Sequence, residues 1–320
     1  SSGSIGYIQG PKYSSYEGKT VGPWGACNSG ANLSAFYRFL FREGDARREF
    51  VNGLWNYSYY TTADGALADS CYINIGYTAY NNKWSKLWTD EGSALGDITT
   101  GSTGINYPYM RYADVLLMYA EAANEYNGNP TTEAINALKQ IRLRAFNGDE
   151  KLIGTIPTDH DGFLKAIIEE NKLEFAGESW RRTEICRWGI QYETLMDTKD
   201  KLVKIAAREG KYANFDRYRA YKPVAGVFEY PDAIVPFIGF NDEAKIADYE
   251  KEGYTVVDMY DSKVAPNTDS ANKMTGISDE AWYKDLFRGL TKNKTEICPL
   301  SQTGVIDVNP GLKDQQAPGY

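Results

Sequence analysis

Apolar residues recur with helical spacing in the middle of the chain, most clearly over residues 111–145. In the first half of this stretch one apolar face follows the i, i+3, i+4, i+7 rule: Tyr112, Val115, Leu116, Tyr119, Ala120, Ala123 and Tyr126. The sequence Asn-Gly-Asn-Pro at 127–130 then predicts a left-handed cap and a stop. A second helix is predicted from Thr131 or Thr132, with a buried stripe at Ala134, Leu138, Ile141 and Ala145. The short connection predicts antiparallel pairing.

The helical pattern continues to about residue 212. A third helix is predicted from near Asp161 to Gly177, with Phe163, Ile167, Ile168 and Leu173 inward. Residues 179–195 then fit one helix or two short ones, and 200–212 form a further amphipathic piece ending at Gly210. Consecutive helix pairs of about 34 residues have the size of tetratricopeptide units, whose diagnostic positions are partly met.

The two flanking regions, 1–106 and 221–320, are irregular: the first is rich in glycine, serine, asparagine and tyrosine, and the second contains many glycines and prolines. Short helices are predicted at 32–44, ending at Gly44, and at 278–290, with Ser278 as cap and Gly289 as stop. Residues 221–242 are expected to be extended or looped. The predicted fold class is therefore mainly α, a tetratricopeptide-like helical-repeat scaffold with a loop-rich remainder containing short strands.

Charge and residue counts exclude several functions. The formal net charge of −8, from 35 basic and 43 acidic residues, offers no cationic surface for nucleic acid. No apolar run approaches 18 residues, so no transmembrane segment is predicted. With a single histidine, His160, the chain has no His-rich zinc site, and Ser-His-Asp or Cys-His chemistry is not predicted. No cofactor or metal site is predicted. The distant cysteines at 27, 71, 186 and 298 are interpreted as buried small residues, with one or two disulfides as the alternative.

Aromatic residues are the best candidates for a binding site, because they make up 14% of the chain, with 25 Tyr and 7 Trp. A ring offers a flat apolar face to a sugar, and nearby amides can bind its hydroxyls. Alternation in 53–62 would place Trp55, Tyr57 and Tyr59 on one face of an extended segment. The candidate ligand-binding residues are Trp55, Tyr57, Tyr59, Tyr60, Asn81, Asn82, Trp84 and Trp88. The alternative is that these rings pack the loop-rich half; Tyr119 and Tyr126 are expected in the core.

Acidic residues at 170–184 could be read as a glycosidase pair, which needs two carboxylates facing one bond. Glu170, Glu174 and Glu178 have i, i+4 spacing, so we expect them to line one helix face and pair with neighbouring cations. Arg187 and Trp188 are expected to pin a helix to a loop. A structural role is therefore preferred to a catalytic one.

Three stretches, which occur in the same order as in the family, resemble the SusD/RagB family of outer-membrane nutrient-binding lipoproteins from Bacteroidetes. They are "YPYMRYADVLLMYAEA" (107–122), "AIIEENKLEFAGESWRRTEICRWG" (166–189) and the ending "NPGLKDQQAPGY". The second is similar to the family pattern through Glu170, Glu174, Phe175, Glu178, Arg181 or Arg182, Glu184, Arg187, Trp188 and Gly189. "EGDARREF" (43–50) is similar to the family's "DPR" region, with Ala46 in place of proline, and "CPLS" departs from its usual Pro-Ile-Pro turn.

This resemblance implies a single SusD-like domain over 1–320 that is truncated at its N-terminus. Its parts would be a loop-rich ligand-side segment (1–106), a helical scaffold (107–220) and a loop-rich C-terminal segment (221–320). It also implies a non-enzymatic protein that binds oligosaccharides, or in some branches peptides, and delivers them to a TonB-dependent outer-membrane transporter. A lipid anchor absent from this chain would hold it on the extracellular face of the outer membrane. The alternatives are a protein- or peptide-binding helical-repeat module and a carbohydrate-active enzyme.

Overall fold

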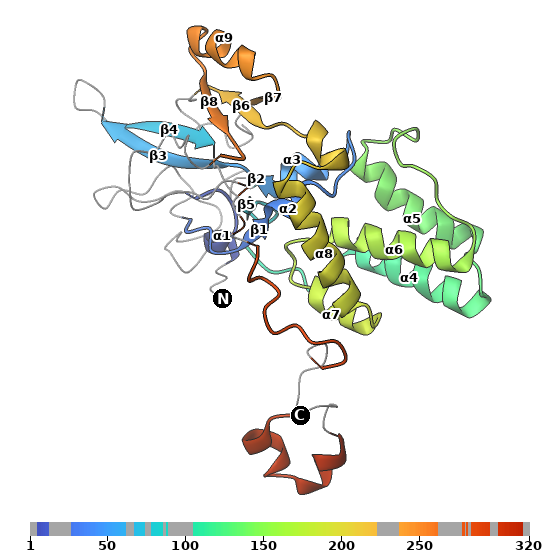
Figure 1. Cartoon of the computed structure of the whole chain (residues 1–320). Helices are drawn as coiled ribbons and strands as arrows, with labels where there is room; N and C mark the ends of the chain where they lie inside the picture. The colour runs from blue at the N-terminus through green and yellow to red at the C-terminus, as the bar shows by residue number, and fades with distance from the viewer. Residues whose placement is uncertain are drawn as a thin grey trace.

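The computed structural model of the protein describes residues 5–12, 27–61, 67–73, 78–85, 88, 105–222, 237–261, 277–278, 280, 283–294 and 300–315. Long helices occupy the middle of the chain, and short strands precede and follow them (Figure 1). This arrangement confirms the predicted mainly α class with a remainder that contains short strands. In the described ranges no helix has both the length and the apolar character needed to cross a bilayer.

The helical part is built from α4 (Tyr112–Asn127), α5 (Thr132–Ala145) and α6 (His160–Glu174), followed by α7 (Arg181–Arg187) and α8 (Gln191–Ala206). Gly128, with φ of +70°, ends α4, and the Thr131 hydroxyl accepts a hydrogen bond from the Ala134 amide at the start of α5. The first three helices lie side by side in Figure 1. They enclose one apolar core of Ala113, Leu117, Ala120, Ala134, Ala137, Leu138, Ile141, Phe163, Ala166, Ile167 and Phe175.

The buried face of α4 differs from the predicted one. Tyr112, Tyr119 and Tyr126 are 70%, 46% and 91% exposed, whereas the prediction placed them in the core. The face that packs on α5 and α6 carries Ala113, Leu117 and Ala120 instead, about one residue around the helix. Small alanines on both helices let their backbones approach closely, and the large tyrosine rings with polar tips stay outside.

Strands of the N-terminal region form two small sheets. β1 (Asn32–Ser34), β5 (Thr78–Asn81) and β2 (Asn52–Gly53) make one antiparallel sheet in the order β1-β5-β2. β3 (Trp55–Thr61) and β4 (Leu67–Ile73) pair antiparallel, with Trp55 opposite Ile73 and Thr61 opposite Leu67. In Figure 1 this β3–β4 ribbon extends from the body on the side opposite to α4–α6. The expected extended conformation of the aromatic stretch is confirmed.

A third sheet follows the helices. β6 (Tyr218–Tyr221) lies between β7 (Phe237–Phe240) and β8 (Thr255–Asp258), and both pairings are antiparallel. A second core cluster joins this sheet to α8 and to the N-terminal region through residues that include Phe39, Trp55, Leu202, Ile205, Val257 and Met259. The remaining short elements are α1 (Ile5–Ile8), α2 (Ala35–Arg38), α3 (Arg47–Val51), α9 (Ile246–Lys251), the 3-10 helices Gly210–Asn214, Glu243–Lys245 and Pro310–Gln315, and the π-helix Gln302–Ile306.

Other predictions were resolved or corrected by the structure. Two helices, α7 and α8, follow α6, and the amphipathic piece at 200–212 belongs partly to α8. The helix predicted at 32–44 shortens to α2, because β1 takes the residues before it. Residues 283–289 form consecutive turns and not an α-helix, with hydrogen bonds that mostly span three residues. Cys27 and Cys186 form no disulfide in the described part of the chain, whereas Cys298 and the side chain of Cys71 lie outside that part.

Candidate functional site

Three of the candidate residues lie in the protein interior. Trp55 is 3% exposed and packs in the core, at the start of β3. The Asn81 side-chain amide donates to the Gly177 carbonyl oxygen (2.8 Å), and that of Asn82 donates to the Phe50 carbonyl oxygen (3.2 Å). In this structure these two amides therefore join the strand region to other segments of the chain.

The two remaining tryptophans are partly buried. The Trp88 indole nitrogen donates to the Asn82 carbonyl oxygen (2.6 Å), and its ring stacks on Phe50 with the centroids 4.3 Å apart. The Trp84 backbone amide donates to the Gln9 side chain (3.2 Å), whereas its buried indole nitrogen has no hydrogen-bond partner within the described residues. The Trp88 ring thus packs on Phe50 of α3, and the backbone at Trp84 is held to Gln9 near the N-terminus.

The tyrosines of β3 are placed by its pairing with β4. Tyr57 lies opposite Cys71, Tyr59 opposite Asp69 and Tyr60 opposite Ala68. Because side chains alternate along a strand, the first two share a face with Trp55, and Tyr60 belongs to the other face. Their side chains lie outside the described part, so their role in a ligand site stays a prediction.

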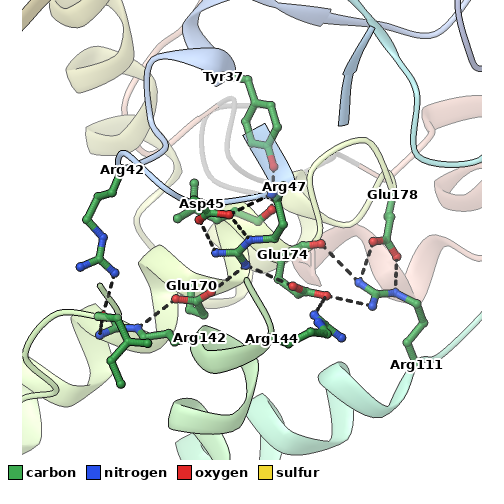
Figure 2. Close-up of polar contacts among 12 residues, drawn as sticks. Tyr37, Arg42, Asp45, Arg47, Arg111, Arg142, Arg144, Glu170, Glu174 and Glu178 are labelled. Atoms are coloured by element: carbon green, nitrogen blue, oxygen red, sulfur yellow. Dashed lines mark hydrogen bonds and ion pairs between the residues drawn. The ribbon is translucent and has the colours of Figure 1, made fainter. Parts of the chain in front are cut away.

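A buried network of charged side chains joins α3, α5, α6 and the segment before α4 (Figure 2). Glu170 and Glu174, on the inner side of α6, and Glu178, in the turn that follows, are each at most 3% exposed. Arg47, at the start of α3, is at its centre and bonds Asp45 (2.8 and 2.9 Å), Glu170 (2.7 Å) and Glu174 (3.1 Å). This one guanidinium ties α3 to α6.

Further cations complete the network from separate segments. Arg111, just before α4, donates to both oxygens of Glu178 (2.7 and 2.9 Å) and to Glu174 (2.9 Å). Arg142 of α5 donates to Glu170 (3.0 Å). Two more cations take part: Arg144, 2.5 Å from Glu174, and Lys83, which contacts Glu178. The predicted pairing of the three glutamates with cations is confirmed, but the partners come from distant segments and Glu178 lies beyond the helix.

Electrostatics keep Glu174 ionised. Burial alone would raise the pKa of its carboxyl, but the cations Arg144, Lys83, Arg47 and Arg111 hold the pKa below its ordinary value. Lys83 shows the opposite balance, because burial lowers the pKa of its ammonium more than Glu178 raises it. Each of the three glutamates already accepts hydrogen bonds or ion pairs from at least two cations. Such groups hold segments together, whereas acid–base catalysis needs a carboxylate with a pKa near the working pH and access to substrate.

The turn after α6 brings Glu178 into the network. Gly177 has φ of +75°, and a Cβ there would lie 2.3 Å from the Asn81 side-chain nitrogen. Glycine is therefore required for both conformation and space.

Arg187 donates two hydrogen bonds to Glu121 of α4 (2.7 and 2.8 Å), and the Trp188 indole donates to the same carboxylate (2.9 Å). The predicted contact by Arg187 and Trp188 is present, but it joins the end of α7 to a second helix, α4, and not to a loop.

The sequence interpretation missed several members of the network: Asp45, Arg47, Lys83 and Arg111. A signal existed, because Glu170 and Glu174 follow the buried Phe163 and Ile167 with helical spacing, and buried carboxylates require internal cations. The identity of those cations depends on long-range packing, which spacing does not reveal. Within the described residues no group of three or more His, Cys, Asp or Glu side chains is arranged to hold a metal ion.

Comparisons with known proteins agree with this architecture. The chain is 42% identical over 89 residues to SusD-like protein P25 of Formosa agariphila, a match covering 27% of this chain and 16% of that protein. It is 38% identical over 85 residues to SusD-like protein P2 of the same organism, which covers 26% of this chain and 17% of that protein. The matched segments thus span about a sixth of the length of these curated relatives.

Structural similarity points the same way. A SusD homolog from Bacteroides thetaiotaomicron, known from a crystal structure, superposes with a TM-score of 0.51 at 24% identity, over 63% of this chain and 40% of that one. At this identity the likeness concerns the fold alone. The model of the SusD family matches residues 34–320, which include α6, the charge network and the C-terminal segment. The chain therefore belongs to the SusD family.

Proposed function

We propose that the protein binds oligosaccharides at the cell surface and delivers them to a partner TonB-dependent outer-membrane transporter. The family match over residues 34–320 carries this proposal, since SusD-family proteins are binding proteins. We place the protein on the extracellular face of the outer membrane through a lipid anchor. It acts without catalysis, and the paired carboxylates of α6 serve to hold the scaffold.

The β3–β4 ribbon is the element that we assign to ligand contact. In Figure 1 it extends from the body on the side opposite to α4–α6. Tyr57 and Tyr59 share one of its faces, which suits the flat C–H face of a sugar ring. Trp84 and Trp88 lie beside the Asn81–Asn82 pair in the neighbouring loop and form the second candidate group.

Titration calorimetry of the 320-residue chain against panels of oligosaccharides and peptides tests the proposal. We expect at least one glycan to bind, and Y57A and Y59A to weaken its binding, because each substitution removes the apolar ring face on which a sugar would rest. Y126A is the matched control, since Tyr126 is 91% exposed at the far end of α4. Peptide binding without glycan binding would contradict the glycan assignment.

A second function, a protein-binding module, is favoured by one observation. The outer side of α4 and the segment before it expose large apolar side chains: Tyr109, Met110, Tyr112, Val115, Met118, Tyr119 and Tyr126. Clusters of this kind mark interaction sites. Because α4 already packs α5 along its inner side, the partner we name is another amphipathic helix. Calorimetry in which V115E abolishes the binding of an amphipathic helical peptide, with no glycan bound, would favour this function.

A further inference from the structure

The outer side of α4 carries a second apolar stripe, separate from the face that packs on α5 and α6. Its members recur at alternating intervals of three and four residues, and all are exposed: Tyr112, Val115, Tyr119, Ala122 and Tyr126. This outer stripe has the a/d spacing of a helix that packs along another helix. Helix α4 therefore offers packing positions on two sides, and in the described part of the chain the inner side alone is covered.

All three charged side chains of α4 bond within the chain. Asp114 accepts a hydrogen bond from the Arg111 backbone amide (2.8 Å), and Glu121 accepts hydrogen bonds from the end of α7. Glu125 lies 3.1 Å from His160, at the start of α6. The outer stripe itself contains no charge. A helix that is apolar on two sides is typical of a buried helix, so the outer stripe is suited to contact with a further helix.

Large and small side chains alternate along the outer stripe, and this alternation determines which helix it fits. The rings of Tyr112, Tyr119 and Tyr126 are separated by the small side chains of Val115 and Ala122. When two such helices pack antiparallel, an a position of one faces a d position of the other. Each layer then pairs one ring with one small side chain, which is the arrangement that lets facing layers interdigitate. The outer stripe is therefore complementary in size to a second copy of itself.

Charge favours the same antiparallel orientation. Glu121 and Glu125 both lie in the second half of α4, near its C-terminal end. A parallel pair would bring these carboxylates and the negative dipole ends of the two helices together, whereas an antiparallel pair separates them. Size and charge thus agree on one arrangement.

We propose that the chain self-associates through α4, with the outer stripes of two copies packed antiparallel about a two-fold axis. The contact is isologous, because both copies use the same surface. A contact centred on one helix of about 24 Å is at the small end of protein interfaces, so we expect a weak dimer with a dissociation constant in the micromolar range. This assignment rests on the surface of the second proposed function, whose helical partner it narrows to a second copy of this chain, and it is independent of glycan binding.

Sedimentation equilibrium of the 320-residue chain, from about 1 µM to about 1 mM, tests the proposal. We expect the average mass to rise toward that of a dimer for the wild type and to stay that of a monomer for V115E, because the symmetric contact would bury two carboxylates. V203E is the matched control, since Val203 of α8 is 46% exposed and Val115 is 43% exposed, and it should associate like the wild type. A monomeric wild type, or equal association of V115E and wild type, overturns the proposal.

A second variant, A122Y, separates a complementary contact from general adhesion of an apolar face. The substitution adds apolar surface at an exposed position, so general adhesion would increase. In the antiparallel pair the added ring would meet a ring of the other copy, and we expect self-association to weaken about tenfold. Stronger association of A122Y overturns the assignment.

The remaining occupant of the surface is a helix from another protein. A chain that stays monomeric but binds an amphipathic helical peptide, with loss of binding in V115E, overturns the second-copy assignment and leaves the protein-binding function intact. Glycan binding is measured separately by calorimetry, so failure of this proposal is distinguishable from failure of the glycan function.

Discussion

Two clusters of arginines in this protein show opposite solutions to the burial of charge. Around Arg47, carboxylates from α6, from the following turn and from Asp45 accept hydrogen bonds from each guanidinium they meet. Around Arg219, two buried guanidinium nitrogens, Nε and Nη1, have no hydrogen-bond acceptor in the described part of the chain. The charges of the first cluster are paired within the described chain, whereas the second cluster leaves two donors without an acceptor there.

The two clusters differ in whether other buried groups depend on the arginine for hydrogen bonds. A buried ion pair is weak evidence for stability, but removal of one partner leaves the other uncompensated and is costly. Arg219 has no hydrogen-bonded carboxylate of this kind in the described chain, although the charges of Glu49 and Asp216 act on it. Replacement of Arg47 or of Arg219 by methionine should therefore change the free energy of unfolding by very different amounts.

Arg47→Met should give the largest effect. It would leave Asp45, Glu170 and Glu174 buried with one cation fewer, and loss of a partner in a buried network costs about 3–5 kcal/mol. Urea denaturation measures the free energy of unfolding. R288M is the control, with an expected change within about 0.5 kcal/mol, because its surface pair with Asp285 is exposed. A loss below about 1 kcal/mol for R47M would contradict the structural role of the network.

Gly177→Ala should cost about 2–4 kcal/mol. An alanine at φ of +75° is strained by about 1–2 kcal/mol, and its Cβ would also displace the Asn81 side chain, which is 2.3 Å away and buried. Gly128→Ala separates the two contributions, since Gly128 has φ of +70° but no atom within 4 Å of the added Cβ. If both variants lose the same stability, the contact with Asn81 does not matter.

Acid sensitivity should depend on Glu174. Its pKa in the folded state is lowered, so its stabilisation is complete above the unfolded value of about 4.3 and is lost as the pH falls through the folded pKa. Between pH 5 and pH 3 the free energy of unfolding should therefore fall less steeply for E174Q than for the wild type, by at most about 1.4 kcal/mol per pH unit. E150Q, at an exposed glutamate, should keep the wild-type slope. An unchanged slope in E174Q would refute this assignment.

Local rules predicted the helices because their signals are local. The left-handed cap at Gly128, the Thr131 hydroxyl and the alanine-rich stripe of α5 all act within a few residues. The buried face of α4 was predicted incorrectly, because tyrosine counts as apolar in the pattern although its bulk favours the outside when alanines allow close packing. The β3 strand was predicted from its alternation, but the burial of Trp55, Asn81 and Asn82 depends on contacts with segments far along the chain. The sequence did not single out Arg219, because its lack of a hydrogen-bond acceptor depends on how distant segments of the chain pack around it.

Arg219→Met should change stability least, and in the opposite direction to Arg47→Met. The substitution removes a buried charge that has no hydrogen-bonded acceptor in the described chain, which is favourable, and also removes its contact with the Phe237 ring, which is worth about 0.5–2 kcal/mol. These effects oppose each other, so we expect a gain of at most about 1 kcal/mol. Urea denaturation of both variants side by side gives the comparison. A loss for R219M as large as that for R47M would show that Arg219 already has its partner within the chain, and the two clusters would then be alike.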